Sequence, residues 1–327
     1  PKKTEMGYFA FLRRLAAGGL VSLSACSSLT AACHSASART VTHSSKTEST
    51  SRRTPTESMF RLDGRVALVT GSSRGIGFAM AVGLADLGAH VVISSSTPSS
   101  LEAARLRLLE RCPGAQCTAL AFDAGDAQAC EQAVAAIVKE HGRIDILVNN
   151  AGINRRAPLE TTSLSDFQRV LDVNLLGPFA LSRACAKHMR AQHWGRIVNI
   201  GSIMGNVGRT ALGPYVSAKH ALHGLTKVMA AELGTDGVNV NCIAPGYIST
   251  ELTSPLQADA AFDGAVKDRN PLGRWGEPID LVGPLVLLAT DACKYINGFV
   301  LVVDGGFTES FHMFGADWNG RPATRLE

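Results

Sequence analysis

Residues 70–77 read Thr-Gly-Ser-Ser-Arg-Gly-Ile-Gly, and this stretch decides the fold of the chain. It joins a β-branched apolar run, Val66–Thr70, to a helical pattern over Gly75–Leu87. Glycine lets the backbone turn sharply and lets a pyrophosphate approach the main chain, and the start of a helix offers free N–H groups and the positive end of its dipole. A tight turn alone would explain one of the three glycines. The stretch therefore predicts a nucleotide-binding turn.

Outward from this turn, residues 59–327 alternate short apolar runs with helical patterns. Seven runs predict strands: Val66–Thr70, Val91–Ser94, Ala119–Phe122, Ile144–Val148, Arg196–Ile200, Val238–Ile243 and Phe299–Val303. Helical patterns between them include Gly75–Leu87, Ala127–His141, Asp166–Arg190, Tyr215–Leu233 and Ile279–Ala289. Several runs are apolar on both faces, and strands that alternate with helices pair in parallel through right-handed crossovers. We expect an α/β protein, a Rossmann-type doubly wound parallel sheet of about seven strands in a single domain.

Residues 1–58 are rich in Ser, Thr and Arg and have no lasting periodicity. The weakly apolar stretch Leu15–Ala32 is too short and too polar to span a bilayer, so no membrane is expected as a partner. Three interpretations stay open: a mitochondrial-type transit peptide, a bacterial lipoprotein signal suggested by the sequence up to Cys26, and an upstream extension that is disordered or untranslated. We favour the extension, because residues 59–64 lead straight into the first strand. The domain at 59–327 is then expected in the cytoplasm, or in mitochondria if residues 1–58 are a transit peptide.

Charge and composition exclude several classes of function. The net charge of +4 arises in residues 1–58, which contain eight basic and three acidic residues and leave 24 basic and 25 acidic residues downstream. A basic surface for nucleic acid is therefore not expected on the folded part. The eight cysteines include no CxxC pair, which favours free thiols over a disulfide framework. The nine histidines show no metal-ligand spacing, so we expect no metal site.

A candidate catalytic group lies in the second half of the domain. Tyr215 and Lys219 are four residues apart on a predicted helix and so share a face. A nearby cation brings the high pKa of a phenol towards neutrality, which would let Tyr215 act as a general acid or base. Ser202 closes a strand, where ligands bind in such sheets, and its hydroxyl can hold the substrate oxygen. The spacing alone leaves an ordinary amphipathic helix as an alternative.

The order of motifs resembles the short-chain dehydrogenase/reductase family over about residues 60–307. The motifs are the glycine turn, Asp123, Asn149-Asn150-Ala151-Gly152, Asn174, Ser202, Tyr215-Val216-Ser217-Ala218-Lys219, Pro245-Gly246 and Asp304-Gly305-Gly306. The resemblance implies an NAD(P)-dependent oxidoreductase that moves a hydride between a nicotinamide and a carbonyl or alcohol carbon of a small molecule. It also implies a homotetramer, in which two long helices of each subunit, here 166–190 and 215–233, pack together.

The same resemblance assigns the site residue by residue. The catalytic residues are Asn174, Ser202, Tyr215 and Lys219, with Lys219 also holding the nicotinamide ribose and Asn174 supporting a water relay. The cofactor-binding residues are Gly71, Ser73, Arg74, Gly75, Ile76, Gly77, Ser95, Asp123, Asn149, Ala151, Gly152, Tyr215, Lys219, Pro245, Gly246, Ile248 and Thr250.

The end of the second strand favours NADP(H) over NAD(H). Binders of NAD usually place an acidic residue there for the ribose 2′-OH, whereas this strand ends in three serines. A hydroxyl at Ser95 can donate to a 2′-phosphate, which a carboxylate would repel, and Arg74 could pair with that phosphate or be a solvated loop cation. Ser96 departs from the family pattern, because relatives that prefer NADP often have arginine there. NAD(H) remains possible.

Four further segments resemble the gluconate 5-dehydrogenase group, which interconverts D-gluconate and 5-keto-D-gluconate. They are residues 150–156, 207–210, 246–253 and 273–278. The pair Arg155-Arg156 is the most telling, because a guanidinium fork suits the carboxylate of a sugar acid. We expect Arg156 to bind substrate together with Ser202 and Tyr215. Another sugar-acid reductase, a 3-oxoacyl carrier-protein reductase and a non-catalytic NADP-binding regulator remain alternatives, and the fold alone does not choose among substrates.

Overall fold

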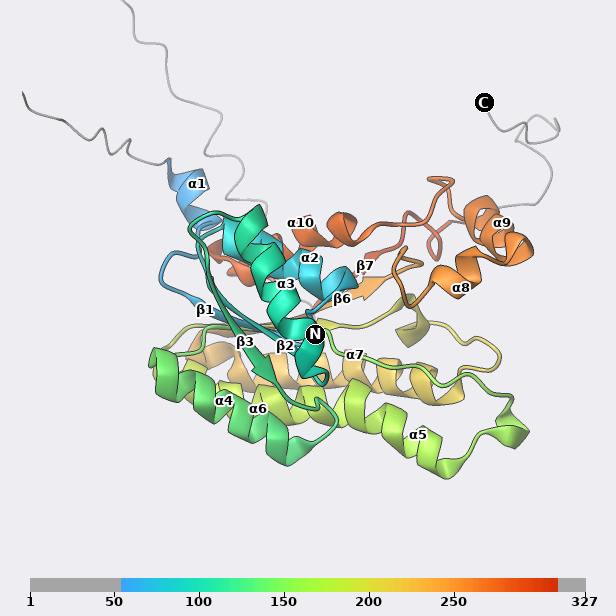
Figure 1. The fold of residues 1–327 in the computed structure, drawn as a ribbon, viewed down its shortest axis with the longest axis horizontal. Helices are drawn as coiled ribbons and strands as arrows, with labels where there is room; N and C mark the ends of the chain where they lie inside the picture. The colour runs from blue at the N-terminus through green and yellow to red at the C-terminus, as the bar shows by residue number, and fades with distance from the viewer. Residues whose placement is uncertain (1–53, 311–327) are drawn as a thin grey trace, which may run out of the picture. The chain divides into compact units, whose positions relative to one another are not determined.

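The structure, a computed structural model, describes residues 54–310. Seven strands of this part of the chain form one sheet in which all neighbours are parallel (Figure 1). They are β1 (Val66–Val69), β2 (His90–Ser95), β3 (Gln116–Ala121), β4 (Ile146–Asn149), β5 (Gly195–Ile200), β6 (Val238–Pro245) and β7 (Val300–Val303). Their order is β3-β2-β1-β4-β5-β6-β7, so the winding reverses between β1 and β4. The predicted doubly wound sheet is confirmed, and ligands bind at such a reversal.

Helices cover both faces of the sheet (Figure 1). One face carries α2 (Gly75–Asp86), α3 (Pro98–Arg111) and α10 (Val282–Ala289); the other carries α4 (Ala127–His141), α5 (Leu164–Leu171), α6 (Gly177–Ala191) and α7 (Gly213–Leu233). Two short helices, α8 (Ser254–Gln257) and α9 (Ala260–Arg269), follow β6 beyond the carboxyl ends of the strands. A single turn, α1 (Pro55–Met59), precedes β1.

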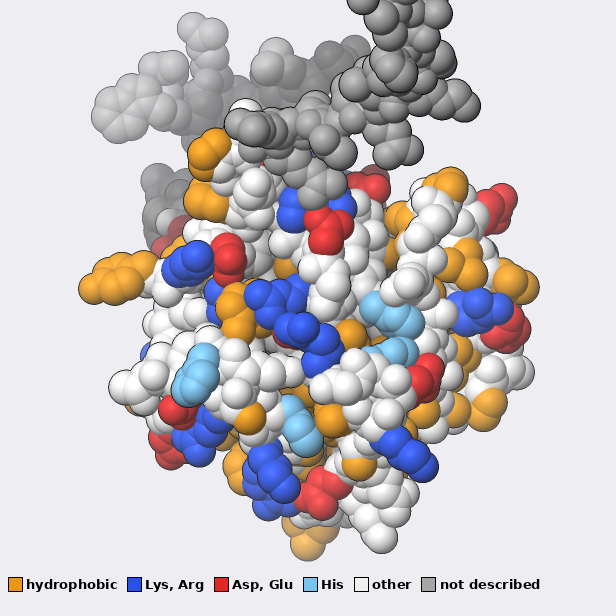
Figure 2. Space-filling view, turned by 90° about the vertical axis from the view of Figure 1, so that its left-hand side faces the viewer, with side chains coloured by type: hydrophobic (Ala, Val, Ile, Leu, Met, Phe, Trp, Pro, Cys, Tyr) orange, Lys and Arg blue, Asp and Glu red, His pale blue; other side chains and the backbone are white. Residues whose placement is uncertain are grey.

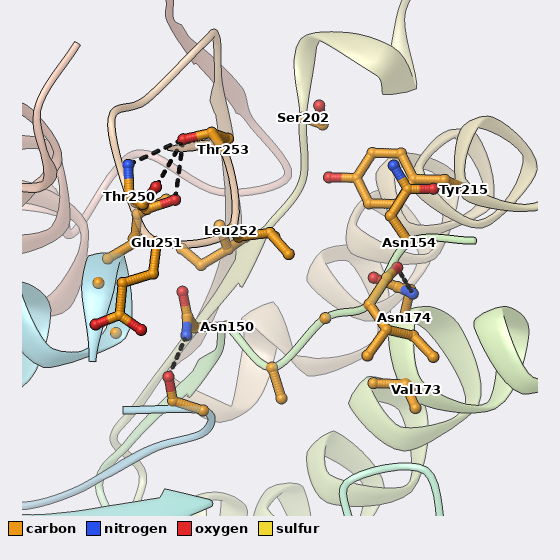
Figure 3. Close-up of a pocket in the computed structure, with 18 of the residues that line it drawn as sticks. Asn150, Asn154, Val173, Asn174, Ser202, Tyr215, Thr250, Glu251, Leu252 and Thr253 are labelled. Carbon is orange, nitrogen blue, oxygen red and sulfur yellow. Dashed lines mark hydrogen bonds between the residues drawn. The ribbon is translucent and has the colours of Figure 1, made fainter. Parts of the chain in front are cut away.

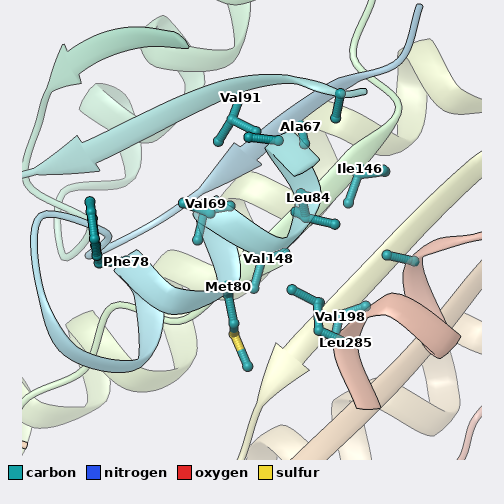
Figure 4. Packing of buried hydrophobic residues seen from close by; sticks show 14 of the residues in the cluster. Ala67, Val69, Phe78, Met80, Leu84, Val91, Ile146, Val148, Val198 and Leu285 are labelled. Carbon is teal, nitrogen blue, oxygen red and sulfur yellow. The ribbon is translucent and has the colours of Figure 1, made fainter. Parts of the chain in front are cut away.

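Alternation along the strands builds two apolar layers. In β1, Ala67 and Val69 face the layer under α2 and α3, while Val66 and Leu68 face the layer under α4 and α6. All four are at most 5% exposed. Figure 4 shows Met80 and Leu84 of α2 beside side chains of β1, β4 and β5 in the first layer. A strand buried on both faces is apolar at most positions, which is why these runs are recognisable in the sequence.

Two helical features differ from the prediction. Helix α3 is not among the predicted helices, because its burial rests on only three side chains, Leu101, Ala104 and Leu108, in an otherwise polar stretch. The single helix expected over 166–190 is interrupted by a π-helical turn at Asp172–Leu176. The side-chain amide of Asn174 donates to Val170 O at 2.9 Å, an acceptor that a regular α-helix would give to a backbone N–H.

The boundary expected at Met59 falls inside α1. Thr54 caps this turn, with its hydroxyl accepting from the Glu57 amide and the Glu57 carboxylate accepting from the Thr54 amide. The rest of the expected extension, residues 1–53, lies outside the described residues. Within residues 54–310, no helix is both long and apolar enough to cross a membrane, and the six cysteines are free thiols.

Candidate active site

A cleft of about 1210 Å³ opens at the carboxyl ends of the strands. Its walls come from the segments that follow β1 to β6, together with the start of α7. Figure 3 shows the loop of Thr250–Thr253 on one side of the cleft and Tyr215, Asn154 and Asn174 on the other. Segments more than a hundred residues apart in the sequence thus share one site.

The cleft collects nearly all the residues expected to act in it. The expected residues that line it are Gly71, Ser73, Arg74, Gly75, Ile76, Gly77, Ser95, Asp123, Ala151, Gly152, Arg156, Asn174, Ser202, Tyr215, Lys219, Pro245, Gly246, Ile248 and Thr250. The exception is Asn149.

Asn149 and Asn150 divide their roles in a way the sequence did not reveal. The side chain of Asn149 is buried beneath the sheet edge and donates to Asn199 Oδ1 at 2.9 Å and to Ser182 Oγ at 3.1 Å. Its side chain therefore braces β4 against β5 and α6, and the assignment of Asn149 to cofactor binding stays a prediction. Asn150 lines the cleft instead, and its amide donates to Thr70 O at 2.8 Å and Gly71 O at 3.0 Å.

The glycine turn forms a cradle in which side chains would not fit. Gly71 has a φ of +60°, and a Cβ added there would lie 2.9 Å from Ala151 Cα. A Cβ on Gly77 would lie 2.5 Å from both Asn150 Nδ2 and Gly71 O. No described side chain caps the first turn of α2, so its N–H groups face the cleft. This arrangement fits the pyrophosphate of a dinucleotide.

Polar groups shape the cleft beside β2 and β3. Ser95 Oγ accepts from the amide of Thr97 at 3.1 Å, and Arg74 is paired with Glu251 at 3.0 Å. Burial would raise the pKa of Asp123, but hydrogen bonds from the Gly125 amide and from Arg169 outweigh it and hold the pKa below its usual value. Asp123 is therefore an ionised acceptor at the cleft wall.

Tyr215, Ser202 and Lys219 meet where β5 ends against α7. Burial raises the pKa of Tyr215, and the hydroxyl of Ser202 acts in the opposite direction to a smaller extent, so the phenol is protonated at neutral pH. Lys219 is 4% exposed and donates to Ile200 O at 2.7 Å, with its Nζ 5.5 Å from the centre of the Tyr215 ring. Burial lowers the pKa of Lys219 to about 8. The three groups can deliver a proton to a substrate oxygen and stabilise the phenolate that remains.

Two amide side chains leave an acceptor unused beside Tyr215 (Figure 3). Asn174 donates to Ile153 O at 2.9 Å, but its buried Oδ1 has no hydrogen-bond partner among the described residues, and the same holds for Asn154 Oδ1. Gly152 makes room for Asn174, since a Cβ there would lie 2.8 Å from this Oδ1. Buried acceptors normally have a donor, so both oxygens suit hydroxyl groups of a bound molecule or water.

Three arginines reach the cleft near the loop after β4 and the loop before α7. Arg156 is exposed, and Arg155 lies 3.7 Å from Asp166. Arg209 is half-buried, donates to Tyr247 Oη at 3.0 Å and lies over the Phe262 ring at 4.7 Å. Arg209 belongs to residues 207–210, one of the segments that resemble the gluconate 5-dehydrogenase group, but the sequence alone gave this residue no role. Its fixed guanidinium makes it a second candidate for an anionic substrate.

The fold and this site define a class of enzyme, and comparison with known families shows which one. The family model described as enoyl-(acyl carrier protein) reductase matches residues 71–308. The chain belongs to the short-chain dehydrogenase/reductase family and is an oxidoreductase of that family.

Its relatives point to a narrower group. A gluconate 5-dehydrogenase from Gluconobacter oxydans is 43% identical over 77% of this chain and 98% of that protein. A 5-keto-D-gluconate 5-reductase from Escherichia coli is 39% identical over 76% of this chain and 97% of its own length. The crystal structure of a gluconate 5-dehydrogenase from Burkholderia cenocepacia, in complex with NADP and tartrate, is 40% identical with a TM-score of 0.75 and covers 78% of this chain and 100% of that one.

Proposed function

We propose that the chain is an NADP(H)-dependent oxidoreductase that interconverts D-gluconate and 5-keto-D-gluconate. The observation that carries the proposal is that Ser202, Tyr215 and Lys219 lie in the same cleft as the glycine cradle. Arginine side chains line the same cleft, as a substrate with a carboxylate requires. Relatives at about 40% identity bear names of this activity.

The side chains of the cleft divide the reaction among them. A bound nicotinamide would supply a hydride to the carbonyl carbon of the substrate. In this proposal Tyr215 donates its proton to the carbonyl oxygen, where negative charge develops, and Ser202 donates a hydrogen bond to the same oxygen. The ammonium of Lys219 stabilises the phenolate left on Tyr215. Oxidation of the alcohol uses the same groups in reverse, with the phenolate as the base.

The cleft also has groups for the rest of a sugar acid. Asn154 and Asn174 offer amide oxygens that have no hydrogen-bond partner among residues 54–310; such oxygens accept from hydroxyl groups and fit a polyol chain. Arg156 and Arg209 can each form two parallel hydrogen bonds with a carboxylate. The Burkholderia cenocepacia enzyme was crystallised with tartrate, a hydroxy acid with carboxylates. We assign the carboxylate to Arg156, which is exposed to the cleft, whereas Arg209 is held by Tyr247.

NADP(H) is the coenzyme that the walls near β2 support. The lining residues from this strand end, Ser94, Ser95 and Ser96, carry hydroxyls and no carboxylate. Solved relatives were crystallised with NADP. A hydroxyl donates to a phosphate, whereas the carboxylate typical of NAD binders would repel it.

The test is a steady-state screen of the full chain with NADPH and NADH. The substrates are 5-keto-D-gluconate, 2-keto-3-deoxygluconate, a 3-oxoacyl thioester and a neutral ketone. We expect the highest kcat/KM for 5-keto-D-gluconate with NADPH. A higher value for the deoxy acid or the thioester would move the chain to that activity. NADPH binding by fluorescence, with no turnover of any substrate, would indicate a regulator instead.

Replacement of one arginine tests the substrate class. A charge-assisted hydrogen bond contributes roughly 1.5–3 kcal/mol, so Arg156→Ala should raise KM for 5-keto-D-gluconate by about ten- to 150-fold. The NADPH affinity and the KM of a neutral ketone should stay unchanged, and Arg156→Lys should rescue binding only in part. Arg209→Ala is the matched comparison. Equal losses on the charged and neutral substrates would show that Arg156 shapes the loop and does not bind the carboxylate.

A further inference from the structure

Arg107 of α3 reaches the cofactor half of the cleft from outside the family motifs. Its Nη2 donates to Ser73 O at 2.7 Å, which places the guanidinium against the glycine turn although 34 residues separate the two in sequence. It lines the cleft together with Ser95, Ser100 and Arg74. None of these contacts could be anticipated from the sequence, which did not predict a helix at α3.

The direction of the side chain brings Arg107 towards the end of β2. Side chains on a helix lean towards its amino terminus, and α3 begins just after β2. Ser100 and Arg107 are seven residues, or two turns, apart and so lie on one face of the helix. Ser100 Oγ lies 3.4 Å from Ser95 Oγ, which ties this face to the strand end where a ribose 2′ substituent is read.

Arg107 is held in place with donors to spare. Its guanidinium lies over the Phe78 ring, 4.7 Å from the centroid, which fixes the plane of the group. A guanidinium has five N–H donors in a rigid fork, and the bond to Ser73 O uses one nitrogen. A planar fork of this kind matches a phosphate group.

The other nearby cation is already engaged. Arg74 pairs with the carboxylate of Glu251 at 3.0 Å, so its charge is partly compensated. The cleft-lining residues between 94 and 107 are Ser94, Ser95, Ser96, Thr97, Ser100, Ala103 and Arg107. Arg107 is the cation among them, and none of them is acidic.

We propose that Arg107 binds the 2′-phosphate of NADP(H), with the hydroxyls of Ser95 and Ser100 as further donors, and thereby determines the coenzyme preference. The proposal rests on the proposed use of NADP(H). In this proposal a residue of helix α3 distinguishes NADP(H) from NAD(H). The family pattern would instead assign this role to Arg74 and to position 96, which is a serine in this chain.

The experiment compares ligands that differ by one phosphate. Adenosine 2′,5′-bisphosphate and adenosine 5′-monophosphate are titrated by calorimetry into the full chain and into its Arg107→Ala variant. We expect Arg107→Ala to weaken the bisphosphate by about ten- to 150-fold and to leave the monophosphate within about twofold. In kinetics, KM for NADPH should rise by the same factor while KM for NADH stays constant, and Arg107→Lys should recover part of the loss.

Arg111→Ala is the matched control. Arg111 also lies over the Phe78 ring, at 5.4 Å, but it does not line the cleft. Its replacement therefore removes a stacking contact and leaves the proposed phosphate-binding group in place. We expect it to change neither titration. Equal weakening of both nucleotides by Arg107→Ala would overturn the proposal, because Arg107 would then only support the turn at Ser73.

The proposed coenzyme and the proposed role of Arg107 are contradicted by different results. A wild-type chain that binds both nucleotides equally would contradict the role of Arg107, whichever coenzyme is used. A wild-type chain that turns over faster with NADH would contradict the proposed coenzyme, and the bisphosphate titration would still decide whether Arg107 binds a 2′-phosphate.

Discussion

Charged groups at the amino ends of the strands are paired differently from those at the carboxyl ends. At the amino ends of the strands, Asp145 is fully buried and accepts from the Val66 amide at 2.9 Å, from Arg65 at 3.0 Å and from Arg143 at 2.6 Å. Arg196 is 2% exposed and donates to Asp291 at 3.1 Å. Figure 2 looks onto this face, where basic side chains gather with histidines and acidic side chains around them.

At the carboxyl ends, three buried groups of the cleft, Lys219, Asn154 and Asn174, lack a charged partner among the described residues. The buried ammonium of Lys219 donates to a backbone carbonyl, and within residues 54–310 it has no carboxylate partner. The pKa of His223, one turn further along α7, is lowered to about 4 by burial and by the charge of Lys219. Asn154 and Asn174 each have an amide oxygen without a hydrogen-bond partner in the part of the chain that the structure describes.

The difference shows where stability and chemistry are placed in this fold. Removing one partner of a buried ion pair destabilises the folded state, whereas a buried polar group without a partner is available to a ligand. We infer that the polar groups at the amino ends of the strands stabilise the fold. Those at the carboxyl ends bind the cofactor and the reacting carbonyl. The following predictions probe this division.

The largest effect is expected at Tyr215. Tyr215→Phe keeps the ring and removes the proton donor, and general acid–base catalysis contributes about 10²–10⁴-fold. Reduction by NADPH should fall by at least that factor while NADPH affinity and melting temperature stay nearly unchanged. Steady-state rates beside a fluorescence titration measure both. Turnover within a few-fold of the wild type would rule out Tyr215 as the donor.

The opposite result is expected at Asp145. Asp145→Ala leaves two guanidinium groups and the Val66 amide without their acceptor, and both arginines keep some solvent contact. We expect the free energy of unfolding to fall by about 2–4 kcal/mol with kcat/KM unchanged, measured by urea denaturation and by kinetics at a temperature where both proteins are folded. A loss of activity without a loss of stability would reverse the roles of the two edges.

A smaller effect with a distinct pH dependence is expected at Lys219. Because burial lowers its pKa from 10.5 to about 8, the unfolded chain binds a proton between these values that the folded chain does not. Stability therefore rises with pH through this window, and at pH 7 the buried ammonium costs about 3 kcal/mol. The stability of Lys219→Met relative to the wild type should then decrease by up to this amount from pH 7 to pH 10.5. A difference that is constant with pH would show that Lys219 is not destabilised by burial.

The sequence predicted the strands well because strands covered by helices on both faces of the sheet are mostly apolar. Most of the seven observed strands lie within two residues of their predicted bounds, and β3 begins three residues before its own. The expected site residues, apart from Asn149, line one cleft, because the carboxyl ends of parallel strands meet on one side of the sheet.

Features that depend on tertiary contact were not predicted. The π-helical turn at Asn174 arises from a side chain that takes a backbone acceptor, and the sequence pattern of a π-turn resembles that of a regular helix. Asn149 and Asn150 are the same residue type, so the sequence could not tell them apart. Their positions at the end of β4 decide that Asn149 binds neighbouring elements and that Asn150 lines the cleft. Arg107 gains its position from Ser73 and Phe78, which belong to other elements.

Hydrogen exchange of the full chain with and without NADPH tests the division between the two edges most directly. A ligand at the carboxyl-end edge protects the backbone amides that it contacts or orders, and leaves distant ones alone. We predict slower exchange in peptides that cover residues 71–78, 150–156 and 246–256, and no change in peptides that cover 61–66, 143–146 and 193–196. Protection of the second group, or of neither group at saturating NADPH, would contradict the account.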